Sequence, residues 1–190
     1  VRAAVRAGAD ALGFVFTPRS KRLLGTRQAA GLVASVPAFV SRVGLFMDQD
    51  SEEVARVLDL VPLNLLQFHG TESADYCRQF GLPYMKAVSM GSERSVPRAL
   101  GAYPDAAALL LDSHSPGGAG GTGIVFDWAM VPESSVPLVL AGGLTPGNVR
   151  QAVERVKPWA VDVSSGVEDR PGIKNVAKME EFIREAKREY

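Results

Sequence analysis

The sequence predicts an α/β protein of the (β/α)₈ TIM-barrel class, and three observations support this. Short apolar runs recur at intervals of about 20 to 30 residues. The segments between them have the period of amphipathic helices. Several runs, such as residues 106–111, are apolar at every position rather than at alternate ones. Continuous runs are typical of parallel strands that are covered on both faces. The pattern therefore indicates strands and helices that alternate around a parallel sheet.

Seven strands are predicted, one for each apolar run, at residues 11–16, 39–46, 63–68, 83–88, 106–111, 137–140 and 160–163. Helical spacing between them is clearest at residues 54–61 and 149–156. Two helix starts are predicted from capping residues. Ser51 precedes two glutamates, and Thr145 precedes Pro146, which is favoured at the first helical position.

Residues 1–7 have the pattern of the later part of a helix, without a strand before it. Seven strands alone would leave two long apolar edges unpaired, whereas eight can close a barrel. We therefore expect a first strand ahead of Val1 that this sequence lacks. An open, doubly wound sheet is the competing architecture, with its site at a single crevice.

Composition favours one domain over residues 1–190. The chain is 46% hydrophobic and 22% charged, and 21 basic residues balance 21 acidic ones. A net charge of zero provides no attraction for nucleic acid or an anionic membrane, so we expect a small-molecule partner. We expect a cytoplasmic location, because there is no apolar run of about 18 residues, no signal peptide and only one cysteine.

The first strand run is followed by three cations, Arg19, Lys21 and Arg22. Side chains at the carboxyl ends of barrel strands build the active site. An arginine can bind a carboxylate through two parallel hydrogen bonds, so Arg22 or Arg19 is a candidate substrate clamp. The alternative is a solvated basic loop.

Two strand ends carry proton-transfer groups. Asp112 follows six apolar residues, and partial desolvation would raise its pKa and suit it to donate a proton. Its alternative role is a turn or helix cap. His69 ends another strand and is a candidate substrate-binding residue, and its alternative is a core histidine held by backbone hydrogen bonds. His114 lies further into a glycine-rich loop, and we predict that it is exposed rather than catalytic.

The last two strand ends supply small residues and free backbone N–H groups, typical of a phosphate site between the final loops of a barrel. The candidates are Gly142, Gly143, Asp162, Ser164, Ser165 and Gly166. Residues 118–123 also match a dinucleotide-binding pattern. A loop separates them from the preceding strand and no lysine follows, so we interpret this segment as a mobile lid.

These residues together resemble the phosphoribosylanthranilate isomerase family along the whole chain. The motifs are Gly13-Phe14-Val15-Phe16 with Ser20-Lys21-Arg22, Gln67-Phe68-His69-Gly70-Thr71-Glu72, Leu111-Asp112, Phe126-Asp127-Trp128, Ala141-Gly142-Gly143-Leu144, residues 162–168, and Pro171-Gly172-Ile173-Lys174. The resemblance implies conversion of N-(5-phosphoribosyl)anthranilate to 1-(o-carboxyphenylamino)-1-deoxyribulose 5-phosphate in tryptophan biosynthesis.

The resemblance also assigns roles. It implies that Asp112 is the general acid that protonates the ribose ring oxygen, and that Arg22 binds the anthranilate carboxylate. A cysteine on the first strand would be the general base, and no residue here matches it. Cys77 lies in a predicted outer helix and is assigned to packing.

The chemistry needs two proton transfers and no electron transfer, so we expect no cofactor and no metal. The assembly is predicted to be a monomer or a homodimer. The alternatives are another phosphosugar barrel enzyme, such as indole-glycerol-phosphate synthase, and a noncatalytic phosphosugar-binding barrel. A dinucleotide-dependent dehydrogenase is the remaining alternative.

Overall fold

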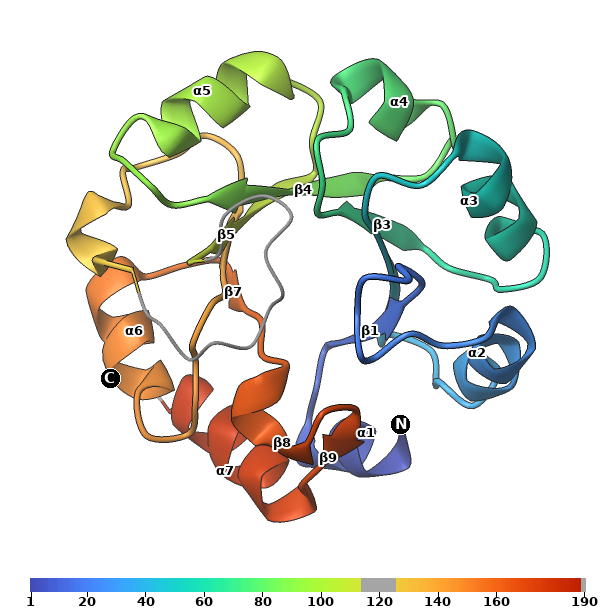
Figure 1. Cartoon of the computed structure of the whole chain (residues 1–190). Coiled ribbons are helices and arrows are strands. Elements are labelled where there is room, and N and C mark those ends of the chain that lie inside the picture. Colours follow the sequence, from blue (N-terminus) through green and yellow to red (C-terminus); the bar gives the residue numbers. More distant parts are fainter. Residues whose placement is uncertain (114–125, 189–190) are drawn as a thin grey trace.

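The computed structural model describes residues 1–113 and 126–188 and contains a curled parallel sheet surrounded by helices (Figure 1). The described residues form a sheet of seven strands, β1 to β7, paired in chain order and parallel throughout. The strands are β1 (Ala11–Val15), β2 (Ser41–Phe46), β3 (Leu65–Phe68), β4 (Tyr84–Ser89), β5 (Ala108–Asp112), β6 (Leu138–Leu140) and β7 (Ala160–Val161). Every predicted run overlaps one of these strands, and β4 and β5 each extend one residue beyond the predicted run. His114 and the predicted lid lie outside the described residues.

The helices are α1 (Arg2–Ala7), α2 (Thr26–Val33), α3 (Ser51–Leu58), α4 (Ala74–Arg78), α5 (Ser95–Ala102), α6 (Val149–Val156) and α7 (Val176–Ala186). Between β5 and β6 the described residues form a 3₁₀ helix, η1 (Trp128–Met130), instead of the α-helix that strict alternation predicts. A second 3₁₀ helix, η2 (Ser165–Val167), and a hairpin of β8 (Glu168–Arg170) and β9 (Ile173–Lys174) precede α7. No helix in the described part of the chain is long and apolar enough to span a bilayer.

Both predicted helix caps are wrong in position. Helix α3 includes Ser51, and Asp50 occupies the N-cap position without a side-chain capping bond. Helix α6 begins only at Val149, after the N-cap residue Asn148. The Asn148 side-chain oxygen accepts a hydrogen bond from the Thr145 backbone N–H at 2.8 Å. The segment from Thr145 to Asn148 is therefore a turn, which delays the start of the helix.

The core has two layers, one on each face of the sheet. Leu109 and Leu111 of β5 face the helices and are fully buried, in a cluster that includes buried residues of α2 through α7. Leu110 faces the inside of the curl, with Val43 of β2 and Met85 of β4. Burial on both faces explains why the strand runs are apolar at every position. Cys77 of α4 is also fully buried in the outer layer, as its packing assignment predicts.

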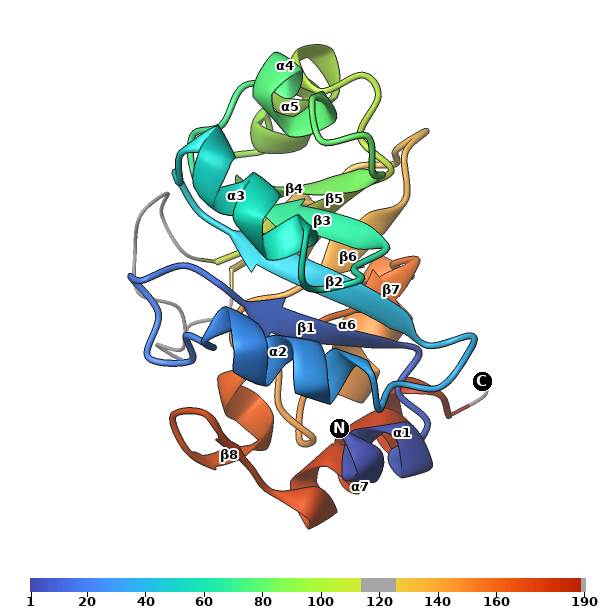
Figure 2. The ribbon, with the colours of Figure 1, turned by 90° about the vertical axis from the view of Figure 1, so that its right-hand side faces the viewer.

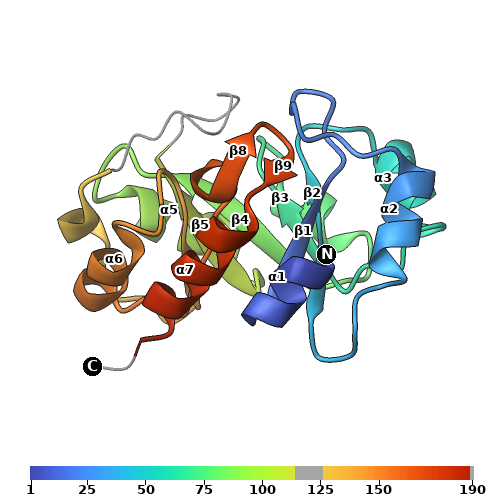
Figure 3. The same ribbon diagram turned by 90° about the horizontal axis from the view of Figure 1, so that it is seen from below.

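The sheet is open between its two edge strands. Within the described residues, β1 and β7 each have a neighbour on one side only, and no counterpart of the expected first strand lies between them. Helices α1 and α7 lie side by side at this opening (Figure 3). The Lys187 ammonium links them by donating to the Gly8 carbonyl at 2.7 Å and to the Asp10 carboxylate at 2.9 Å.

A second link across the opening joins the loop after β1 to the segment after β7. The Arg22 guanidinium donates two parallel hydrogen bonds to the Glu168 carboxylate, of 2.8 Å from Nε and 2.7 Å from Nη2. Lys174 Nζ lies 3.0 Å from the same carboxylate. Desolvation raises the pKa of Glu168, but the hydrogen bonds from Arg22 and Lys174 outweigh it and lower the pKa to about 2. Bidentate, charge-assisted pairs of this kind are among the stronger polar contacts in proteins.

We predict that Glu168 makes folding stability depend on pH in the acid range. Its carboxyl has a pKa of about 2 in the folded chain, against an ordinary value of 4.5. The stabilisation is therefore complete above about pH 5 and is lost as the pH falls from about 4.5 towards 2. Urea unfolding between pH 2 and 6 should show a smaller decrease in the free energy of unfolding for Glu168→Gln than for the parent.

The matched control is Glu180→Gln, at an exposed position of α7. If this control flattens the pH dependence as much as Glu168→Gln does, the effect does not come from the Arg22–Glu168 pair.

Candidate active site

The candidate site lies where the carboxyl ends of the parallel strands meet. Figure 2 shows these ends of β1, β2 and β3 on one side of the molecule. Asp112 is the last residue of β5 and is 9% exposed, and His69 directly follows β3. Although β4 separates the two strands, His69 Nε2 lies 3.2 Å from Asp112 Oδ2. Both side chains therefore reach into the inside of the curl.

The His69 ring is held by side chains at both nitrogens. Its Nδ1 atom lies 3.1 Å from the Gln67 side-chain amide nitrogen, which is a donor. In this arrangement Nδ1 accepts, the proton is on Nε2, and Nε2 donates to Asp112 Oδ2, which can accept whether or not the other carboxyl oxygen carries a proton. The alternative of a core histidine held by backbone hydrogen bonds is therefore wrong. Asp112 makes a tertiary contact with His69 through this bond.

The Gly142-Gly143 turn after β6 packs directly against Asp112. Both glycines have positive φ angles, of 79° and 69°. A Cβ at position 142 would lie 2.8 Å from Asp112 Oδ1 and 2.5 Å from the Ser113 backbone nitrogen. Only glycine lets the backbone pass this close. The turn is held from outside by Asn148, whose amide donates to the Gly143 carbonyl at 3.0 Å.

The two loops of the predicted phosphate site are in contact. A Cβ on Gly166, within η2, would overlap the carbonyl oxygen of Leu144, so the loops after β6 and β7 pack backbone to backbone. Lys174 Nζ donates to the Ser164 carbonyl at 2.8 Å and brings a positive charge to this place. Adjacent loops with small residues and a cation have the chemistry that binds phosphate.

Asp162 lies between these two parts of the site, just after β7. The residue is accessible to solvent, but the protein around it desolvates its carboxyl group, and this is the main reason why the pKa of Asp162 is raised. Repulsion from the Asp112 carboxylate adds to the shift, while Lys174 and His69 oppose it. Two carboxyl groups in mutual repulsion favour a proton on one of them.

The three cations after β1 have different environments. Arg22 is partly buried, and Glu168 occupies its Nε edge, which leaves the Nη1 side of the guanidinium for another acceptor. Arg19 is exposed and lies 3.1 Å from the Asp48 carboxylate, and Lys21 is exposed. Of the candidate clamps, Arg22 is thus the one with a fixed orientation.

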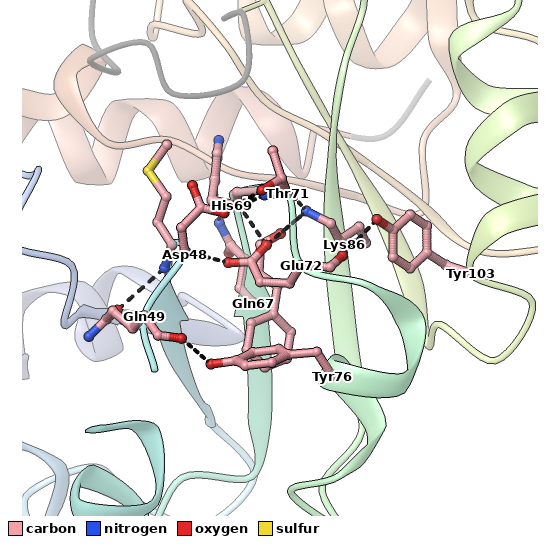
Figure 4. Close-up of polar contacts among 12 residues, drawn as sticks. Asp48, Gln49, Gln67, His69, Thr71, Glu72, Tyr76, Lys86 and Tyr103 are labelled. Carbon is pink, nitrogen blue, oxygen red and sulfur yellow. Dashed lines mark hydrogen bonds and ion pairs between the residues drawn. The ribbon is translucent and has the colours of Figure 1, made fainter. Parts of the chain in front are cut away.

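Sequence reasoning missed a buried ion pair beside His69. Lys86 of β4 is 2% exposed and Glu72 is 7% exposed, with 3.2 Å between Nζ and Oε2 (Figure 4). The available signal was a lysine inside the apolar run of residues 83–88. It also missed Glu168 as the partner of Arg22. Among the described residues, no group of three or more His, Cys, Asp and Glu side chains is arranged to hold a metal ion.

Comparisons with known proteins agree with one another. A family model described as N-(5'phosphoribosyl)anthranilate (PRA) isomerase matches residues 1–185. The N-(5'-phosphoribosyl)anthranilate isomerase of Hahella chejuensis is 49% identical over 185 residues, which is 97% of this chain and 87% of that protein. The protein of that name from Pseudomonas fluorescens strain Pf0-1 is 50% identical over 182 residues, or 95% of this chain and 89% of its own.

Solved structures give the same result. The phosphoribosyl anthranilate isomerase of Thermotoga maritima matches with a TM-score of 0.89 and 41% identity, over 98% of this chain and 92% of that one. A second structure is a phosphoribosyl anthranilate isomerase in complex with reduced 1-(o-carboxyphenylamino)-1-deoxyribulose 5-phosphate. It matches with a TM-score of 0.82 and 39% identity, over 98% and 91% of the two chains.

Proposed function

The chain belongs to the N-(5'-phosphoribosyl)anthranilate isomerase family, and from this premise we propose which residues carry out the reaction. The enzyme is an isomerase of tryptophan biosynthesis that converts N-(5-phosphoribosyl)anthranilate to 1-(o-carboxyphenylamino)-1-deoxyribulose 5-phosphate. The observation that supports the proposed site best is the Asp112–His69 pair at the strand ends, packed against the Gly142 turn.

Asp112 is the proposed general acid. Opening the furanose ring requires a proton on the ring oxygen, and a carboxyl group that keeps its proton near neutral pH can supply it. Asp112 is nearly buried, and Asp162 adds a second carboxyl group nearby, so this end of the sheet disfavours two negative charges. After the transfer, the new Asp112 carboxylate can accept a hydrogen bond from His69 Nε2.

Proton removal from the ribose C2 carbon needs a second group. The family resemblance implies a cysteine on a first strand, which residues 1–190 do not include. Cys77 is unsuited to this task, because it is fully buried in α4 and desolvation raises the pKa of its thiol to about 12. A thiol with this pKa stays protonated at neutral pH and is a poor base.

Two anion sites complete the proposal. The Nη1 side of Arg22 would bind the anthranilate carboxylate, while Glu168 fixes the plane of the guanidinium. The adjoining loops with Gly143, Ser164, Ser165 and Gly166 would bind the phosphate, with Lys174 nearby. The partner is thus a small phosphorylated molecule with a negative charge at each end.

We also propose that residues 1–190 act as one domain in the cytoplasm, as a monomer or homodimer. One core layer that includes residues from β1 to α7 supports the single domain. A related Thermotoga maritima protein is described as dimeric, with monomeric variants.

For Asp112→Asn we predict that kcat falls by about 10²- to 10⁴-fold, because the amide cannot donate the proton. Binding of the reduced product, measured by calorimetry, should persist, since an asparagine keeps the size of the side chain. Asp169→Asn, at an exposed position, is the matched control. Near-parent turnover by Asp112→Asn would contradict the role of general acid.

For Arg22→Ala we predict a KM for substrate that is about ten- to a hundredfold higher, as expected when a charged hydrogen-bonding partner is lost. The change in kcat should be smaller, because the carboxylate takes no part in either proton transfer. Arg19→Ala is the control, with the KM of the parent. If Arg22→Ala keeps the parent KM, the carboxylate binds elsewhere, and an increase in Arg19→Ala or Lys21→Ala would identify where.

A further inference from the structure

Each hydrogen-bond donor of the buried Lys86 ammonium has an acceptor among its neighbours. Its Nζ atom donates to the carbonyl oxygens of Phe68 at 3.1 Å and Gly70 at 2.5 Å, and lies 3.2 Å from Glu72 Oε2 (Figure 4). An ammonium group has three donors, and here each has an acceptor. A buried charge is costly unless it is paired and hydrogen-bonded in this way. The Lys86 ammonium is therefore held by three acceptors that all belong to residues 68–72.

Two of these acceptors are on either side of His69. The carbonyl groups of Phe68 and Gly70 precede and follow it in the chain, so Lys86 holds the backbone on both sides of the histidine. The last strand-like bond of this segment is from the His69 N–H to the Phe46 carbonyl at 2.9 Å. Beyond that bond the chain leaves the sheet. There the Lys86 ammonium, rather than a neighbouring strand, hydrogen-bonds to the backbone carbonyl groups.

The Glu72 carboxylate holds the same segment by accepting hydrogen bonds from backbone N–H groups. It accepts from the Gly70 backbone N–H at 2.9 Å and from the Asp48 backbone N–H at 2.8 Å. Asp48 in turn accepts from the Thr71 N–H at 2.6 Å and from its hydroxyl at 2.9 Å. The packing is close, because a Cβ on Gly70 would overlap the Asp48 carboxylate. The segment from 68 to 72 is thus tied to β2 and β4.

We propose that Lys86 and Glu72 are positioning residues that hold His69 so that its Nε2–H meets Asp112. They do not reach the reacting atoms themselves. Their effect passes through the backbone at Phe68 and Gly70 to the His69 ring, and from its Nε2 atom to Asp112, 3.2 Å away. This inference rests on the role proposed for Asp112.

The competing explanation is that the ion pair serves only stability. Buried ion pairs add little net stability over apolar side chains of similar size, whereas loss of one partner alone is damaging. A variant that removes both charges therefore separates the two explanations. Lys86→Met with Glu72→Gln leaves no unpaired buried charge and keeps acceptor and donor atoms at position 72.

The first test observes the His69 ring without any turnover. The chain has two histidines, so His114→Gln leaves His69 as the only imidazole. Nitrogen NMR of the imidazole should show one tautomer, with the proton on Nε2, in this background. In the Lys86→Met/Glu72→Gln variant we expect a mixture of tautomers. An unchanged single tautomer in a folded variant would overturn the proposal.

The second test is a kinetic cycle with His69→Asn. Lys86→Met/Glu72→Gln should lower kcat by up to about 10²-fold, as for a catalytic group displaced by about 1 Å, with little change in KM. In the His69→Asn background the same pair of changes should cause no further loss. Equal losses in both backgrounds would show that the pair acts through stability alone.

Val33→Ala is the matched control for stability, because it opens a cavity in fully buried packing of α2, away from His69. It should lower the melting temperature and leave kcat and the NMR tautomer unchanged. If the parent protein binds the reduced product but has no turnover, the proposed function fails, and the NMR test still decides the positioning role.

Discussion

Parallel strand pairing is the constraint on which the rest of the structure depends. Because β1 to β7 all run in the same direction, the residues that follow β3, β5, β6 and β7 are brought to a single edge of the sheet. This is how His69 and Asp112, 43 positions apart, come within hydrogen-bonding distance. The same arrangement puts the Gly142 turn against Asp112 and the Gly166 loop against Leu144. No single loop carries the site, because its residues come from the ends of several strands.

Acidic side chains gather at one part of this edge and basic side chains at another. This distribution of charge suits a substrate with two anionic ends. Asp112 and Asp162 form an acidic centre, where desolvation and repulsion from Asp112 raise the pKa of Asp162. Arg22 and Lys174 lie to one side, with Glu168 between them. One carboxylate between two cations leaves an excess positive charge, which a substrate carboxylate or phosphate can neutralise. The acidic groups and the cations thus lie at different strand ends, and the Lys174 charge still acts on Asp162, where it opposes the rise of the pKa.

Much of this could be predicted from the sequence, for physical reasons. Apolar runs mark strands directly, and their parallel order is enough to place Asp112 and the glycine loops at strand ends. Pairings between distant residues could not be predicted. Lys86 carries a charge inside an apolar strand, and only the folded chain shows that its three acceptors surround His69. The start of α6 was missed because Asn148 uses its side chain within a turn.

The bond between Arg22 and Glu168 spans 146 positions of the chain. Arg22 is made long before its partner, which emerges only after β1 to β7 have been made. A nascent chain therefore carries the Arg22 guanidinium without Glu168 until the segment after β7 has emerged, even if its first strands have already paired. The proposed carboxylate-binding part of the site takes its fixed geometry only once the whole sheet is available.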